Sequence, residues 1–133
     1  MRNKALQELE TLTNQLVNRD VELKKTYETL TLALTLCSIG VWDLDIPNNI
    51  LKWDSNMIKI FNRNVSSYED FLFCLHDDDR NFVSGAINKC LKEESRYDNK
   101  YRINTDEGIK NIHAIGEVTQ RGTRFTGVCV VIK

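Results

Sequence analysis

Apolar residues recur every seven positions near the N-terminus of the chain. Leu9, Leu16, Leu23 and Leu30 are each one heptad apart, and residues 3–36 contain neither glycine nor proline. A strict seven-residue repeat is the period of a left-handed coiled coil, whereas a helix that packs on its own domain follows a period of 3.6. We therefore expect one long helix over residues 3–36 that joins two copies of the chain in parallel.

A second set of positions faces the same side of this predicted coil. When the leucines occupy heptad position d, position a holds Leu6, Thr13, Asp20, Tyr27 and Leu34. Polar residues at a, here Thr13 and Asp20, lower stability but help to fix the register and the number of helices. The predicted dimer interface is Leu6, Leu9, Leu16, Leu23, Tyr27, Leu30 and Leu34. An amphipathic helix that packs on its own domain is the alternative.

After residue 36 the pattern changes to shorter segments. Ser38-Ile39-Gly40 is expected to end the long helix, with Gly40 in the left-handed conformation that often follows a helix. Alternating and apolar runs predict strands over residues 41–46, 49–53, 97–104, 110–119 and 124–132. Caps and helical spacing predict helices over residues 54–61, 66–75 and from about 76 to 92. Short glycine turns join the last three strands, so we expect an antiparallel meander there.

The order of these elements defines the predicted fold class. A long helix is followed by two strands, three short helices and three strands. This order favours an α+β domain with a single antiparallel sheet and helices on one face. We assign residues 1–36 to the coiled coil and residues 37–133 to the compact domain, which has an ordinary size for one hydrophobic core.

Composition restricts the classes of partner. The 133 residues include 18 Lys and Arg and 19 Asp and Glu, giving a net charge of −1. The two signs are mixed and basic runs stop at two residues, so nothing indicates nucleic-acid binding. No apolar run approaches the ~20 residues of a membrane span, and the N-terminus is polar. We therefore expect a cytoplasmic protein with no membrane segment in this chain.

The cysteines and the acidic cluster do not resemble a catalytic or metal site. Cys37, Cys74, Cys90 and Cys129 lie far apart among apolar residues, so we expect reduced, mostly buried thiols without zinc or redox roles. The consecutive aspartates at 77–79 point about 100° apart on a helix, which suits a helix start better than a metal ion. No nucleophile–base pair is recognisable either. We expect no catalytic residues and no enzymatic activity in this domain.

Five stretches from residue 32 onwards share an order and a spacing with a known family. They are Leu32–Asp45, Leu51–Ser55, His76–Arg80, Tyr101–Ile103 with Asp106–Gly108, and Ile112–Gly116. Together they resemble a PAS domain of the subgroup found in bacterial sensor proteins, over about residues 30–133. The stretch His-Asp-Asp-Asp-Arg is similar to the family's His-Pro-Asp-Asp-Arg turn, with Asp77 in place of the proline.

This resemblance implies both a fold and a role. PAS domains have a five-stranded antiparallel sheet in the order 2-1-5-4-3, with helices over one face that can enclose a ligand pocket. N-terminal coiled coils of this kind link domains in series and form parallel homodimers. The resemblance therefore implies a sensory or signal-relay module of a histidine kinase or diguanylate cyclase, with a second copy and neighbouring signalling domains as partners. The alternative is a ligand-free module used only for dimerisation or docking.

A ligand would lie between the inner sheet face and the helical region at residues 57–75. The candidate lining residues are Trp42, Leu44, Met57, Phe61, Phe71, Tyr101 and Ile112. The only two histidines, His76 and His113, are interpreted as structural residues rather than haem ligands. Cys74 and Cys90 lack the Asn-Cys-Arg neighbours of a flavin-binding helix. No cofactor is predicted, haem and flavin are not expected, and a small-molecule ligand is compatible with the resemblance.

Overall fold

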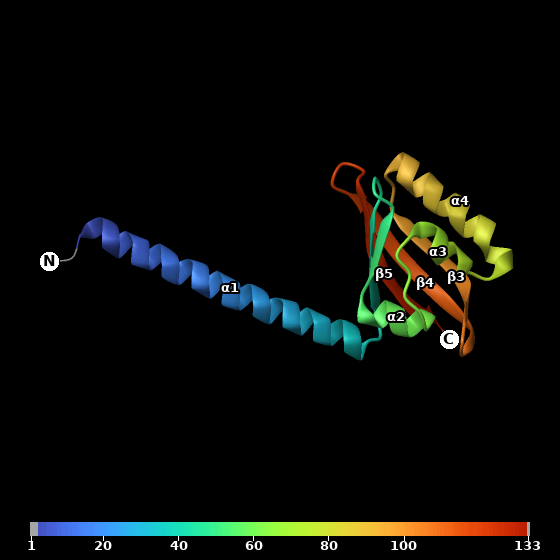
Figure 1. Cartoon of the computed structure of the whole chain (residues 1–133), viewed down its shortest axis with the longest axis horizontal. Helices are drawn as coiled ribbons and strands as arrows, with labels where there is room; N and C mark the ends of the chain where they lie inside the picture. The colour runs from blue at the N-terminus through green and yellow to red at the C-terminus, as the bar shows by residue number, and fades with distance from the viewer. Residues whose placement is uncertain (1–2, 133) are drawn as a thin grey trace. The chain divides into compact units, whose positions relative to one another are not determined.

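The computed structural model describes residues 3–132, and the chain divides after Leu36 into two units. The first unit contains helix α1 (Lys4–Leu36), which is 33 residues long (Figure 1). Three of its threonine hydroxyls donate to the carbonyl one turn earlier, as in the 2.8 Å bond from Thr13 to Leu9. The hydroxyl of Thr13, which occupies heptad position a, is therefore hydrogen-bonded within its own helix. The predicted long helix is confirmed.

The apolar stripe of α1 consists of the residues at heptad positions a and d. Leu6, Leu9, Leu16, Leu23, Tyr27 and Leu30 are exposed, and Leu34 is half-buried. The exposed fraction reaches 72% for Leu23 and Tyr27. Burial of apolar surface is favourable by about 25 cal/mol per Å². Covering this exposed stripe with a second apolar surface would therefore be favourable.

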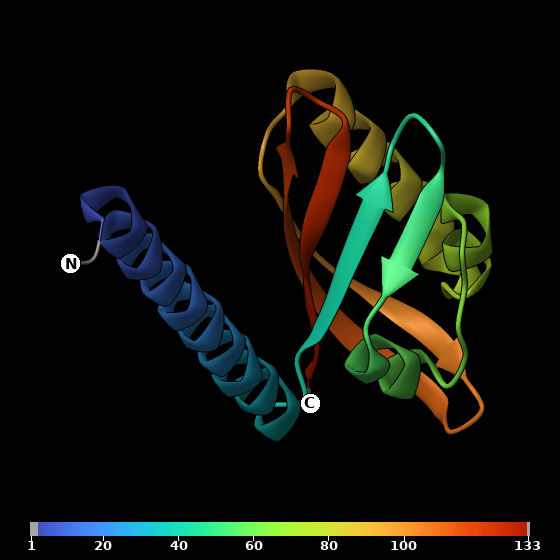
Figure 2. The same cartoon turned by 60° about the vertical axis from the view of Figure 1, so that its left-hand side comes forward.

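The second unit contains a five-stranded sheet in the order β2-β1-β5-β4-β3 (Figure 2). The strands are β1 (Gly40–Asp45), β2 (Ile50–Trp53), β3 (Tyr97–Thr105), β4 (Gly108–Thr119) and β5 (Arg124–Ile132). Every neighbouring pair is antiparallel. The predicted sheet and its strand order are therefore confirmed.

Three helices cover one face of this sheet (Figures 1 and 2). They are α2 (Ser55–Phe61), α3 (Tyr68–Phe73) and α4 (Asp77–Glu93). Each begins at a side chain that accepts a backbone N–H: Asp54 from Met57, Ser67 from Asp70, and His76 from Asp78. Such caps satisfy amides that have no partner inside the helix. The α+β class with helices on one face is confirmed.

The core lies between these helices and the inner face of the sheet. Side chains alternate between the two faces of each strand, so every second residue points inward. The register aligns one inward-facing row across all strands: Trp53, Trp42, Gly127, Gly116 and Tyr97. The largest fully buried side chains come from both layers: Phe61, Met57, Leu75, Ile103, Ile112, Val83 and Cys129.

The prediction that Gly40 ends the long helix in a left-handed conformation is wrong. Ser38 takes that conformation, with a φ of 55°, and Gly40 is the first residue of β1. A Cβ atom at position 40 would lie 2.6 Å from the sulfur of Met57 and 3.0 Å from its backbone nitrogen. The glycine therefore allows β1 to pack closely on α2, and helix termination does not depend on it.

The same substitution at two glycines should have opposite effects. Gly85 lies in the exposed middle of α4, and no atom lies within 4 Å of an added Cβ. Gly85→Ala should raise the free energy of unfolding by about 0.5–1 kcal/mol, because alanine has the higher helix propensity. Gly40→Ala should lower it by about 1–3 kcal/mol, because the added methyl group overlaps Met57. Urea unfolding measures both, and a stabilised Gly40→Ala variant would contradict the packing of β1 on α2.

Candidate functional site

A small cavity of about 40 Å³ lies between the inner face of the sheet and the helices. Its wall is predominantly apolar and contains residues from every strand and from α2, α3 and α4. The lining residues are Trp42, Leu44, Leu51, Trp53, Met57, Tyr68, Phe71, Ile87, Tyr97, Tyr101, Ala114, Phe125 and Cys129. The cavity is therefore the place where the two layers of the domain meet.

The structure brings most of the predicted pocket residues to this cavity. The predicted residues in its wall are Trp42, Leu44, Met57, Phe71 and Tyr101. Phe61 and Ile112 are buried in the same core but do not line the cavity. Phe61 instead packs against Trp53, with ring centroids 4.4 Å apart.

Of the residues that the last three strands contribute to the wall, sequence reasoning found only Tyr101. Tyr97 on β3 and both Phe125 and Cys129 on β5 line the cavity. The two-residue alternation of strands could have identified them. Tyr97 is four residues before the predicted Tyr101 and shares its face, and Phe125 shares a face with Cys129.

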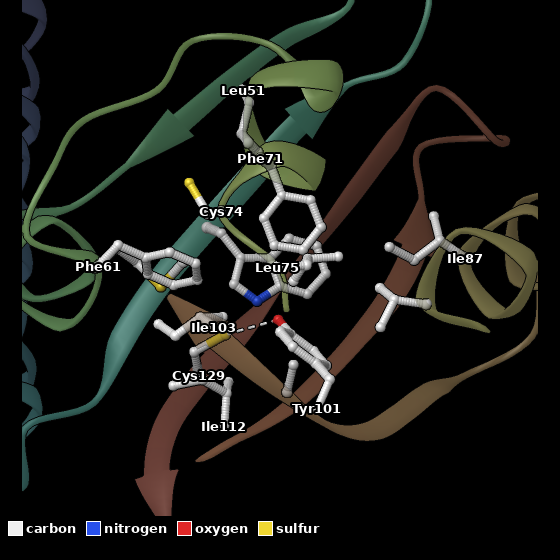
Figure 3. Packing of buried hydrophobic residues seen from close by; sticks show 14 of the residues in the cluster. Leu51, Phe61, Phe71, Cys74, Leu75, Ile87, Tyr101, Ile103, Ile112 and Cys129 are labelled. Carbon is white, nitrogen blue, oxygen red and sulfur yellow. Dashed lines mark hydrogen bonds between the residues drawn. The ribbon is translucent and has the colours of Figure 1, made fainter. Parts of the chain in front are cut away.

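Polar groups beside the cavity are few, and burial keeps them neutral. The Tyr101 hydroxyl lies 3.8 Å from the Cys129 sulfur (Figure 3). Burial raises the pKa of Cys129 to about 12 and raises the pKa of Tyr101 well above its usual value. Both groups are therefore protonated at neutral pH, and a protonated thiol is a poor nucleophile. These two groups can offer a neutral hydrogen bond to a ligand, beside extensive apolar contact.

The volume limits what the cavity can hold in this conformation. A water molecule needs about 10–15 Å³, and an apolar cavity of about 150 Å³ holds benzene. At about 40 Å³ this cavity is too small for a six-membered aromatic ring. A ligand of more than a few atoms therefore requires the surrounding side chains to move.

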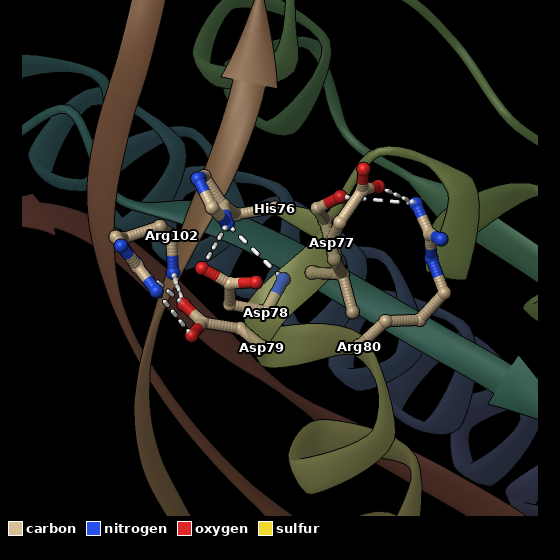
Figure 4. A network of polar contacts seen from close by, with 7 residues as sticks. His76, Asp77, Asp78, Asp79, Arg80 and Arg102 are labelled. Carbon is tan, nitrogen blue, oxygen red and sulfur yellow. Dashed lines mark hydrogen bonds and ion pairs between the residues drawn. The ribbon is translucent and has the colours of Figure 1, made fainter.

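The His-Asp-Asp-Asp-Arg turn joins the start of α4 to the edge strand β3. The Arg102 guanidinium donates to both carboxylate oxygens of Asp79 at 2.8 and 3.0 Å, and the Arg102 backbone N–H donates at 2.8 Å (Figure 4). These hydrogen bonds lower the pKa of Asp79 from 3.8 to about 2. The His76 N–H also donates to the Arg102 carbonyl, and the Asn104 N–H to that of Cys74. The segment before α4 thus pairs with β3 as a short extra strand would.

The three aspartates of this turn have separate surroundings (Figure 4). Arg80 donates to the Asp77 carboxylate and to the Leu72 carbonyl, both at 3.0 Å, and so secures the end of α3. Asp78 is 79% exposed. The residue that caps α4 is His76, and the aspartates form its first turn, where the helix dipole favours negative charge. Within residues 3–132, no group of three or more His, Cys, Asp or Glu could hold a metal ion.

Both histidines lie away from the cavity. His76 accepts the Asp78 N–H at the start of α4. His113 on β4 pairs with Asp98 on β3 at 2.7 Å, and the alternation of the two strands places both side chains on the outer face of the sheet. Three of the four cysteines are buried as predicted, whereas Cys37 is exposed. Both histidines therefore make hydrogen bonds within the domain, His76 at the start of α4 and His113 across two strands.

No family model matches the sequence. The chain is 25% identical over 105 residues to the probable diguanylate cyclase DgcE of Escherichia coli (strain K12), a match that covers 77% of this chain. The chain spans only 10% of the length of that curated relative. The match therefore concerns a segment of a much longer protein.

Solved structures share the fold at low sequence identity. A sensory box histidine kinase/response regulator from Burkholderia thailandensis E264 matches with a TM-score of 0.63 and 23% identity, over 77% of this chain and 83% of that one. The N-terminal domain of a diguanylate cyclase with PAS/PAC sensor from Marinobacter aquaeolei matches with a TM-score of 0.65 and 15% identity. That match covers 70% of this chain and 94% of the other.

The chain therefore has the fold of a PAS domain, preceded by a long helix. Its structural neighbours include sensor domains of histidine kinases and diguanylate cyclases. Within the described part of the chain, no helix is both long enough and apolar enough to cross a membrane.

The bond between Asp79 and Arg102 should make stability depend on acid pH. Because folding lowers the pKa of Asp79 to about 2, its contribution is complete above about pH 4 and disappears as the pH falls through 2. Asp79→Asn should lower the free energy of unfolding at pH 7 by about 1–2 kcal/mol, a figure reduced for partial exposure of the pair to solvent. Urea unfolding between pH 2 and 7 measures both effects.

Asp78→Asn is the matched control, because it makes the same change at the exposed neighbour. Its unfolding midpoint at pH 7 should stay close to that of the unchanged chain. If both variants lost the same free energy of unfolding, the ion pair between Asp79 and Arg102 would not be what anchors the turn.

Proposed function

We propose that this chain is a signal-relay module of a larger signalling protein of the histidine kinase or diguanylate cyclase type. In this proposal α1 pairs with α1 of a second copy as a parallel coiled coil. A signal changes the relative rotation or register of the two helices, and catalysis belongs to other domains. The observation that carries the proposal is the exposed heptad stripe of α1 in a chain with the PAS fold.

The heptad spacing supports a coil that runs to the end of the helix. Cys37 follows Leu30 by seven residues, stands directly after α1 and is exposed. A parallel pair brings the two Cys37 residues together at the point where each chain leaves the coil. An antiparallel pair places them at opposite ends. Cys37 therefore reports on the direction of pairing.

Hydrogen bonds tie the residues after α1 to helix α2 and support a path for the signal. The buried Asn56 amide donates to the Ile39 carbonyl at 2.9 Å. The Asp54 carboxylate accepts from the N–H groups of Val41 and Met57 at 3.0 and 2.9 Å. A displacement of the chain at Ile39 is therefore passed to α2 and to Met57 in the wall of the cavity.

The size of the cavity favours a relay that works without a bulky ligand. About 40 Å³ leaves room for a few atoms, whereas the sensory version of the proposal needs a very small ligand or a rearranged interior. Native mass spectrometry of the purified chain separates the two versions. We expect masses that correspond to the protein without any bound ligand. The additional mass of a bound metabolite would favour the sensory version.

Charged residues in the heptad stripe should separate the proposed dimer. Leu16→Lys with Leu23→Lys places repelling charges at two d positions, so the sedimenting species should fall from twice the chain mass to the chain mass. Analytical ultracentrifugation measures this directly. An unchanged dimer would contradict pairing through α1.

Leucine and valine residues outside the stripe provide the matched control. Val21 and Leu32 are 60% and 59% exposed and occupy heptad positions b and f. Val21→Lys with Leu32→Lys adds the same charge to the same helix and should leave the dimer intact. If this control separated the dimer equally, the general charge of α1 would be responsible and not the stripe.

A further inference from the structure

The indole of Trp42 lies over two paired glycines of the neighbouring strands. The register partner of Trp42 on β5 is Gly127, which pairs in turn with Gly116 on β4. A Cβ atom on Gly116 would lie 2.4 Å from Cη2 of Trp42, and one on Gly127 would lie 2.4 Å from Cζ2. The six-membered ring of the indole therefore rests on both glycines. Any larger residue at either position would displace it.

The side chains around the indole form a place for a flat ring. The neighbouring row of the sheet holds the small residues Ala114 and Cys129. Phe125 packs edge-on against Trp42 with ring centroids 4.6 Å apart, and Tyr97 packs edge-on against Phe125 at 5.6 Å. Edge-to-face partners around a floor of small residues suit a planar aromatic group. In this structure that group is a side chain of the chain itself.

We propose that Trp42 is a built-in occupant of the domain interior: its indole takes the place of a planar aromatic ligand and closes the cavity. The cavity of about 40 Å³ is the part of the interior that the indole does not fill. An indole-sized aromatic molecule is then the class of ligand that binds once the Trp42 side chain is removed. The inference rests on the proposed relay function, because an interior filled by its own residue needs no bulky ligand.

A double-mutant cycle on the full chain tests the contact between Trp42 and the glycine floor. Gly116→Ala should lower the melting temperature in the unchanged chain, because the methyl group meets the indole. In a Trp42→Ala background most of that decrease should disappear. The Thr126 carbonyl oxygen, 2.9 Å from the added Cβ, is present in both backgrounds, so the difference isolates Trp42. Equal decreases in both backgrounds would overturn the proposal.

Free indole tests the aromatic site itself. The Trp42→Ala chain should bind one indole per domain in calorimetry and gain melting temperature, while the unchanged chain should do neither. Phe82→Ala removes an aromatic ring on α4 that is 53% exposed and does not line the cavity, and it should not bind indole. No binding by Trp42→Ala, or equal binding by all three chains, would overturn the proposal. If Trp42→Ala does not fold, Trp42→Phe takes its place in the cycle, and recovery of folding on addition of indole is the binding result.

Two separate measurements distinguish a failure of this inference from a failure of the proposed function. Sedimentation of the same variants reports whether α1 joins two copies, and indole binding reports only on the interior. A dimer without indole binding would reject the built-in occupant and keep the relay. Indole binding by a monomeric chain would do the reverse.

Discussion

The contact of the Trp42 indole with Gly116 and Gly127 determines how the two layers of this domain meet. The ring lies on the floor of the sheet, so α2, α3 and α4 pack over an aromatic side chain and little free volume is left. Gly40 extends the same constraint along β1, because only a glycine allows Met57 of α2 to come so close. Dense packing of this kind resists gradual deformation and passes a displacement on to its neighbours. A closed interior therefore favours a domain that transmits movement.

The opposite condition holds for α1. Most of its heptad stripe is exposed to solvent, while the hydroxyls of Thr11, Thr13 and Thr29 are hydrogen-bonded inside the helix. The residues that follow are fixed by Asp54 and Asn56 to the start of α2. The core is closely packed, the heptad stripe is exposed, and hydrogen bonds hold the residues that follow α1. Together these features support a relay that works through a change in the pairing of two α1 helices.

Much of this arrangement follows from the sequence, and the exceptions have physical causes. The heptad leucines and the caps at Asp54 and Ser67 are local signals, so α1 and the short helices were predictable to within a few residues. Strand alternation would also have found Tyr97 and Cys129, because each shares a strand face with another residue of the wall, Tyr101 on β3 and Phe125 on β5. The prediction for Gly40 is wrong because the need for glycine there comes from the close approach of Met57, which belongs to another element, α2. The cross-strand glycines beneath Trp42 depend on register, which spacing along one strand does not reveal.

The distance between the two Cys37 residues in solution tests the central claim most directly. The other three cysteines are buried, so a spin label attaches to Cys37 of the otherwise unchanged chain. A parallel coiled coil predicts one short, narrow distance, because both labels stand at the same end of the pair. An antiparallel pair of 33-residue helices separates them by about 50 Å. A distance near that value, or no dipolar coupling at all, would contradict a parallel relay through α1.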